Sequence, residues 1–222
     1  MDGCWDESFC IFARENLAGN TFDIEKLKQV LDAKQQGYQQ TTNVINYLAS
    51  HDQSHLLAEA SFRTLDPEAA FKRAKWGAVL LVTAVKIPML WMGEELGKST
   101  RETPNQPDKL QWSLFKNQPN HQLLAYYKHV ILLREKVPAL YTKNIEFFHE
   151  NAETKVIAYY RWSDEGTRAV VVANFSDTYL SGNSIPNFPA GTWQELMYNK
   201  ILEVGEEGFK FYLPEWSAQV FV

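Results

Sequence analysis

Two continuous apolar runs in the first half of the chain end in polar residues. They are residues 43–52, NVINYLASHD, and residues 87–97, IPMLWMGEELG. Unbroken apolar runs of this kind are typical of strands that are buried on both faces of a parallel sheet. Parallel α/β barrels place their chemistry at the C-terminal ends of the strands. The polar residues that close each run are therefore the first candidates for a functional site.

Helical periodicity surrounds these two runs. Apolar residues recur at helical spacing over residues 6–18, where Gly19 would follow the last turn, and over residues 22–33. Asp66 and Pro67 form a strong helix start, as N-cap and first helical residue, for a helix that runs to about residue 84. A further amphipathic helix is predicted over residues 120–136, where Pro138 stops it.

The pattern changes period after Pro138. Short β-rich runs separated by Asn, Gly, Asp and Pro cover residues 144–148, 156–162, 169–175, 191–196, 209–213 and 218–222. They predict an antiparallel sandwich, so we divide the chain into an α/β part, residues 1–138, and an all-β domain, residues 139–222. Two parallel strands leave open sheet edges. The first part should therefore need the sandwich, a partner subunit or a missing N-terminal segment to cover it.

Composition narrows the classes of partner. The 222 residues are 45% hydrophobic, which is enough for a real core, and the net charge is -5 without any basic block. Nucleic acid thus has no electrostatic reason to bind, and a neutral polymer is the more natural ligand. No apolar run is long enough for a membrane span, the N-terminus lacks the features of a signal peptide, and Cys4 and Cys10 suit a reduced protein. These features predict a cytoplasmic protein.

Several segments together resemble the α-amylase superfamily, glycoside hydrolase family 13. They are DGCWDESF near the N-terminus, NYLASHDQ, IPMLWMGEELG, LLREKVPAL and VIAYYRWSDEGTRAVVVANFSD. The resemblance implies an α/β plus all-β chain: the C-terminal portion of a (β/α)8 TIM barrel, about its last two to three βα units, followed by an antiparallel β-sandwich. The form of these segments resembles bacterial amylases and glycogen branching enzymes, without separating the two.

The resemblance also implies roles for single residues. Asp52 matches the catalytic acid that stabilises the transition state, and His51 and Gln53 match substrate-binding positions. A carboxylate that holds sugar hydroxyls strengthens its contacts as charge develops on the ring. Glu94 and Glu95 are expected to cap the turn after the second apolar run. Lys86 stands where the family has a small residue, and it should fit if its ammonium reaches solvent. No metal or cofactor is implied.

The two other carboxyl groups of a retaining glycosidase are not found in this sequence. In the family they come from the fourth and fifth barrel strands, whereas Asp2, Asp6 and Glu7 match neither catalytic motif. We therefore expect a C-terminal fragment of an enzyme acting on starch, glycogen or maltooligosaccharides, inactive alone. An internal start codon, a two-chain enzyme that needs an N-terminal barrel partner chain, and a partial sequence are the alternatives that would explain it.

Two other functions remain open from the sequence. The pattern His51-Asp52-Gln53-Ser54-His55 has the spacing of a zinc hydrolase motif, which works only on a helix where both histidines share a face. Alternatively, residues 139–222 could act as a non-catalytic glucan-binding module through Trp162, Trp193 and Trp216. Alternation along the strands predicts instead that many of these aromatic side chains point into the sandwich.

Overall fold

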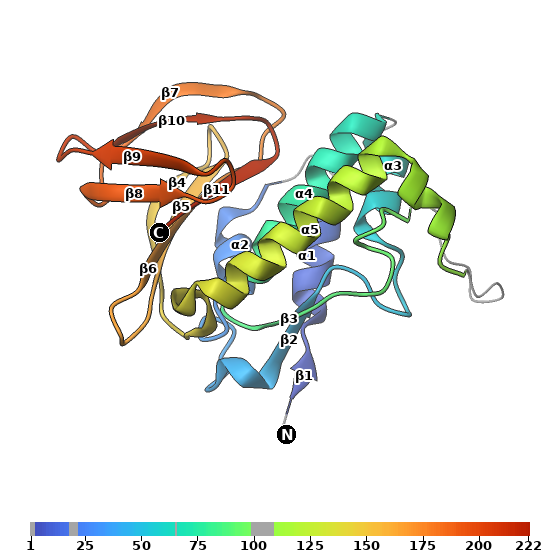
Figure 1. Cartoon of the computed structure of the whole chain (residues 1–222). Coiled ribbons are helices and arrows are strands. Elements are labelled where there is room, and N and C mark those ends of the chain that lie inside the picture. Colours follow the sequence, from blue (N-terminus) through green and yellow to red (C-terminus); the bar gives the residue numbers. More distant parts are fainter. Residues whose placement is uncertain (1–2, 18–21, 65, 99–108) are drawn as a thin grey trace. The chain divides into compact units, whose positions relative to one another are not determined.

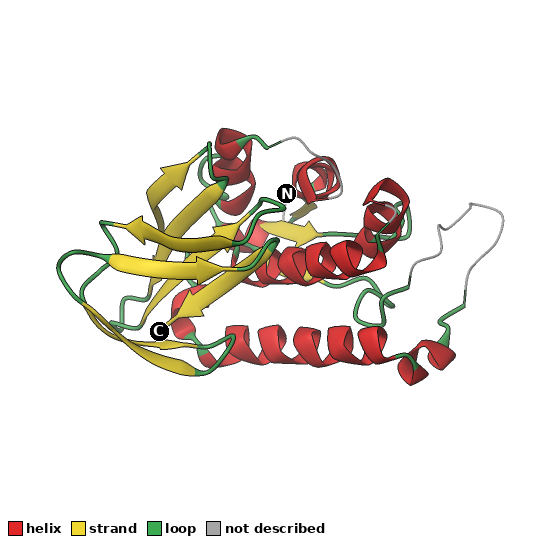
Figure 2. Cartoon of the chain, turned by 90° about the horizontal axis from the view of Figure 1, so that it is seen from above, coloured by secondary structure: helices red, strands yellow, loops and turns green. Residues whose placement is uncertain are grey.

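The computed structural model describes residues 3–17, 22–64, 66–98 and 109–222. The chain separates into two compact units, residues Met1–Leu132 and Leu133–Val222. Asp2 and Gly19, which the sequence analysis uses, lie outside the described residues. Figure 1 labels the elements, and Figure 2 separates helices from strands by colour. Each unit is built from a different kind of sheet.

Unit 1 is organised around a three-stranded parallel sheet in the order β1-β2-β3. Its strands are β1 (Cys4–Trp5), β2 (Val44–Tyr47) and β3 (Ile87–Met89), and its helices are α1 (Glu7–Leu17), α2 (Ile24–Leu31), α3 (Leu56–Thr64), α4 (Pro67–Thr83) and α5 (Gln118–Lys136), the last continuing past Leu132. Two short 3-10 helices, η1 (Thr41–Asn43) and η2 (Trp112–Lys116), complete the described elements of this unit. The central strand β2 is the one that carries the predicted site.

Local sequence explains where the helices begin. The Asp66 side chain accepts a hydrogen bond from the backbone N–H of Glu68 at 2.9 Å, and Pro67 occupies the first turn of α4. Asp23 caps α2 in the same way, through the N–H of Lys26 at 3.0 Å. The predicted start at Asp66 and Pro67 is confirmed. The helix α3 was not predicted, because its apolar residues continue directly from the polar turn before it.

The core of unit 1 lies where the apolar helix faces pack. Its largest fully buried side chains are Phe9, Phe12, Leu27, Leu31, Leu48 and Trp76. The strands are shorter than the apolar runs predict, since β2 ends at Tyr47 although Leu48 and Ala49 are also fully buried. Among the described residues, no helix is long and apolar enough to cross a lipid bilayer.

Unit 2 is an antiparallel all-β structure. A short 3-10 helix, η3 (Pro138–Tyr141), precedes eight strands: β4 (Ile145–Asn151), β5 (Val156–Trp162), β6 (Arg168–Asn174), β7 (Leu180–Ile185), β8 (Gly191–Glu195), β9 (Lys200–Val204), β10 (Phe209–Leu213) and β11 (Ser217–Phe221). Six of these strands form a sheet in the order β4-β5-β6-β11-β8-β9, and β10 pairs with β7 in a second sheet. The predicted antiparallel arrangement is confirmed, with β7 and β9 added.

The apolar faces of the two sheets share one core. It contains Val156, Val170, Val172, Phe188, Phe211, Leu213 and Phe221. Trp193 and Trp216 are each 6% exposed, and their indole N–H groups donate to Pro189 O and to the Asp177 carboxylate. The prediction that such tryptophans point inward is confirmed for these two, so neither offers a free face to a ligand.

A buried arginine fastens the segment before β4 to the sheet. Arg161 lies in β5 and is completely buried, although a buried guanidinium is stable only when its donors are satisfied. Its Nε donates to Asn144 O at 2.8 Å, and its Nη2 donates to Thr142 O at 2.8 Å and to Leu140 O at 3.3 Å. Three backbone carbonyls between residues 140 and 144 are thus held by one side chain.

Candidate functional site

A tight turn after β2 presents the three predicted site residues. Ser50, which is buried, accepts the backbone N–H of Asp52 at 3.1 Å through Oγ, and its carbonyl accepts the N–H of Gln53 at 3.3 Å. The Ser50 hydroxyl also donates to Gln53 Oε1. The turn leaves the side chains of His51 and Asp52 61% and 70% exposed. Two of the three predicted side chains therefore face solvent, while Gln53 is engaged by the turn.

His51 and Asp52 lie side by side at this strand end. His51 Nε2 is 3.3 Å from Asp52 Oδ2, so the imidazole and the carboxylate form one polar pair. Such a pair offers both a donor and acceptors to a hydroxyl-rich ligand. The structure thus brings together the two residues that the sequence nominates, at the C-terminal end of the central strand.

Two aromatic rings lie close to His51, and a third ring packs against one of them. The rings of Trp5, at the end of β1, and Trp91, just after β3, lie with their centroids 5.9 and 6.1 Å from that of His51. Tyr47 ends β2 and packs against Trp5 at 5.5 Å. Flat rings of this kind combine apolar faces with a polar edge. Sequence reasoning missed these three rings as site residues, although each stands at or just beyond the end of a predicted or observed strand.

The turn after β3 is held by its two glutamates, as predicted. Glu94 Oε2 accepts the backbone N–H of Trp91 at 2.8 Å, and Glu95 Oε2 accepts that of Gly93 at 3.0 Å. Gly93 adopts φ 97°, a conformation that favours glycine. Glu94 is buried, and this burial raises its pKa to about 8, although the hydrogen bond from Trp91 opposes the shift. The turn therefore fixes the position of the Trp91 backbone.

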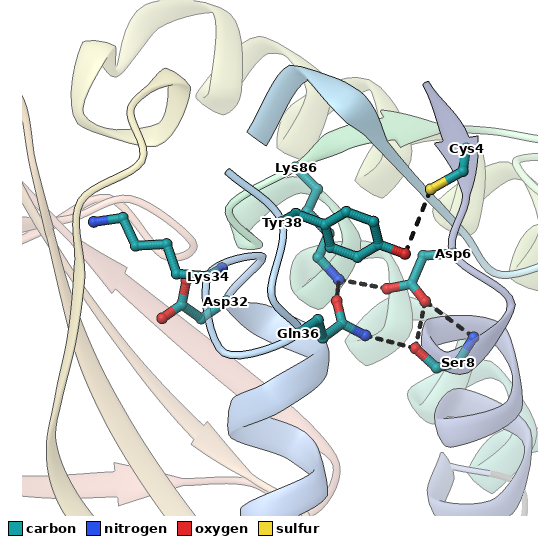
Figure 3. Close-up of polar contacts among 8 residues, drawn as sticks. All are labelled: Cys4, Asp6, Ser8, Asp32, Lys34, Gln36, Tyr38 and Lys86. Carbon is teal, nitrogen blue, oxygen red and sulfur yellow. Dashed lines mark hydrogen bonds and ion pairs between the residues drawn. The ribbon is translucent and has the colours of Figure 1, made fainter. Parts of the chain in front are cut away.

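Lys86 does not reach solvent, so that expectation was wrong. Figure 3 shows its ammonium donating to the carboxylate of Asp6 and to Gln36 Oε1. Asp6 also accepts the backbone N–H of Ser8 at 3.0 Å. Burial raises the pKa of Asp6, but the Lys86 charge and the hydrogen bonds outweigh it and lower the pKa overall. A carboxylate at the end of β1 thus replaces the solvent as the partner of the lysine.

The zinc-motif geometry is not found in the segment 51–55. These residues form a turn and an extended stretch before α3, so the two histidines do not share a helical face. His55 is 1% exposed, and its Nε2 lies 3.0 Å from Met92 O, whereas His51 faces solvent. Among the described residues, no group of three or more His, Cys, Asp and Glu side chains is placed to hold a metal ion.

Comparison with known proteins finds similarity over most of the chain. The family described as the α-amylase C-terminal all-beta domain matches residues 148–222. A cyclomaltodextrinase of Bacillus sp. is 29% identical over 154 residues, 68% of this chain and 26% of that protein. Neopullulanase 2 of Thermoactinomyces vulgaris is 22% identical over 209 residues, 94% of this chain and 34% of that protein.

Solved structures share the fold along the whole chain. The α-amylase of Geobacillus thermoleovorans, solved with acarbose, superposes with a TM-score of 0.82 at 19% identity, over 100% of this chain and 48% of that one. The fold is that of the C-terminal part of α-amylases. The match over residues 148–222, together with these relatives, supports a C-terminal all-β domain of the α-amylase type. The chain spans about a quarter to a third of the length of these two curated relatives.

Proposed function

We propose that this chain is the C-terminal part of an α-glucan-active glycoside hydrolase or transglycosylase of the α-amylase type. The observation that carries the proposal is the exposed His51–Asp52 pair at the end of the central parallel strand, framed by Trp5 and Trp91. Unit 1 would then be the last three strands of a (β/α)8 barrel. Its substrates would be starch, glycogen or maltooligosaccharides, in keeping with the names of the relatives.

In this proposal Asp52 stabilises the transition state through sugar hydroxyls. Its carboxylate accepts hydrogen bonds that strengthen as positive charge develops at the anomeric carbon, and His51, whose Nε2 lies 3.3 Å from Asp52 Oδ2, binds a hydroxyl of the same sugar. Gln53 helps to shape the turn, since its side chain accepts a hydrogen bond from Ser50 and is also hydrogen-bonded to Tyr47. The rings of Trp5 and Trp91 would face the apolar side of the sugar.

Cleavage needs two further carboxyl groups about 5 to 5.5 Å apart, a nucleophile and an acid/base. Asp6 cannot serve as either in this proposal, because it is buried in the ion pair with Lys86. These groups would come from an N-terminal barrel segment, either in the same polypeptide or in a partner chain. The residues present here would hold the sugar without breaking the bond.

Co-expression tests the proposal. The chain is expressed with an N-terminal barrel segment of the α-amylase type that supplies the two further carboxyl groups, and hydrolysis of soluble starch is measured for the complex and for each part alone. We expect activity only in the complex, and a loss of at least about a hundredfold for Asp52→Asn. Asp66→Asn, which changes an exposed N-cap to another good capping residue, is the matched control and should leave activity unchanged. Full activity of the Asp52→Asn complex would refute the proposed role.

A further inference from the structure

A pocket of about 490 Å³ in unit 1 is lined by the N-terminal parts of α4 and α5. Pro67 and Phe71 of α4 and Pro119 of α5 give it apolar walls, and Lys72 and Lys75 of α4 add two cationic side chains. It shares no residue with the candidate site described above. Its volume falls in the range of small-molecule binding sites, and it combines apolar with cationic groups.

Lys75 is the cation of this pocket that lacks a counter-charge. It is half-buried, and among the described residues no carboxylate forms an ion pair with its ammonium. The ammonium lies 5.8 Å from the centroid of the Tyr126 ring of α5, whose face attracts a cation and ties the end of this side chain to the second helix. Glu68 pairs instead with Lys72, at 2.9 Å. The groups that line the pocket therefore carry an excess of positive charge.

The surroundings of Lys75 favour the neutral, nucleophilic form of its amine. Burial lowers the pKa of Lys75, and the charge of Lys72, three residues earlier on the same helix face, lowers it further. Desolvation and a neighbouring cation are the two ways in which proteins activate a lysine to attack a carbonyl group. At a given pH, a larger fraction of Lys75 is therefore the free amine than of a lysine with its ordinary pKa.

Lys72 adds an anion-binding group beside this amine. Side chains three positions apart on a helix have Cβ atoms about 5 to 6 Å apart, so a molecule a few atoms long can reach both lysines. An ammonium has three N–H donors, and the pair with Glu68 does not exclude a phosphate oxygen as a further partner of Lys72. The apolar walls suit the body of such a molecule and limit the access of water, which would hydrolyse an imine.

We propose that Lys75 is a modification site, at which a small aldehyde that carries a phosphate group forms an imine. The lone pair of Nζ adds to the carbonyl carbon, and the carbinolamine then loses water, which carries away the carbonyl oxygen and both hydrogens of the amine. The step needs no oxidant or reductant. Lys72 donates to the phosphate, and the protonated imine keeps the contact of a cation with the Tyr126 ring. The proposal does not depend on sugar binding by His51 and Asp52.

Reductive labelling of the full chain with pyridoxal phosphate tests the proposal. The chain is incubated with a limiting amount of this aldehyde at neutral pH, the imines are reduced with borohydride, and the labelling rate of each lysine is measured by peptide mass spectrometry. Lys128, an exposed lysine of α5 that does not line the pocket, is the internal reference. We expect Lys75 to be labelled about tenfold faster than Lys128, the factor that one charge-assisted hydrogen bond to the phosphate supplies. Equal labelling of the two lysines would overturn the proposal.

Further measurements separate the parts of the proposal. Lys75→Arg keeps the charge but cannot form the imine, so only the label at residue 75 should disappear. Lys72→Met should reduce the preference for Lys75, and so should unphosphorylated pyridoxal on the unsubstituted chain, which needs no variant to fold. An unchanged preference with pyridoxal would refute the role of the phosphate. In guanidinium chloride the two lysines should be labelled equally, and a preference for Lys75 that persists there would overturn the proposal, because the pocket is then absent.

Discussion

Replacing Lys86 by Met should destabilise unit 1 by about 3 kcal/mol, at the lower end of the 3 to 5 kcal/mol typical of breaking a buried ion pair. Lys86 and Asp6 are only 3% and 4% exposed, so the substitution leaves a buried carboxylate without its counter-charge. The loss is at the lower end because Asp6 keeps its hydrogen bonds from the backbone N–H and the hydroxyl of Ser8. Removing both charges in Asp6→Leu/Lys86→Met should recover most of the lost stability.

Urea unfolding followed by the helical circular-dichroism signal measures this effect, because most of the helical residues described lie in unit 1. Lys72→Met is the control: it breaks the exposed Lys72–Glu68 pair of 2.9 Å and should change stability by less than about 0.5 kcal/mol. The pKa of Asp6 is lowered by folding, so its contribution holds above the unfolded value of 3.8 and is lost as the pH falls through the folded value. A Lys86→Met variant as stable as the unsubstituted chain would refute the reasoning.

Two further substitutions test buried polar groups of unit 1. Burial raises the pKa of Glu94 from 4.5 to about 8, so between these pH values the folded state binds a proton that the unfolded state releases. The free energy of unfolding should therefore fall as the pH rises from about 4.5 to 8. Glu94→Gln should flatten this slope in thermal scans across that range, and an unchanged slope would contradict the raised pKa of Glu94. Asn46 is fully buried in β2, and neither atom of its side-chain amide is hydrogen-bonded among the described residues. Asn46→Leu should therefore raise the free energy of unfolding, measured in urea, by about 1 kcal/mol. A loss of stability in this variant would show that the amide has a partner.

The parts of the fold that follow from local physics were predictable. The cap at Asp66, the stop before Pro138 and the β-rich runs of β5 and β6 act within one turn or one strand, and the structure reproduces them. The strand β7 was not predicted, because its sequence, LSGNSI, has a polar centre and a glycine and so lacks the apolar pattern of a strand. Its place depends on a strand more than twenty residues away, and no local pattern reports such pairing.

The residues of the candidate site were likewise predictable only where the local sequence determines them. His51 and Asp52 could be nominated because they follow an apolar run, and their roles stay predictions. Trp5 could not be nominated by this route, since β1 is only two residues long and its pairing with β2 is what brings the ring beside His51. The burial of Lys86 depends on Gln36 and Asp6, which lie 50 and 80 residues away in the sequence. Side-chain partners at such separation come from the tertiary fold.

The three carbonyls held by Arg161 decide where the all-β unit can be cut. The family match begins at residue 148, which would suggest expressing that stretch by itself. Such a protein would lack Leu140, Thr142 and Asn144, whose carbonyl oxygens accept hydrogen bonds from the guanidinium of Arg161, and the first residues of β4, which pair with the end of β5. An autonomous version of this unit should therefore begin no later than Pro138. The stretch that sequence comparison delimits is shorter than the stretch that can fold.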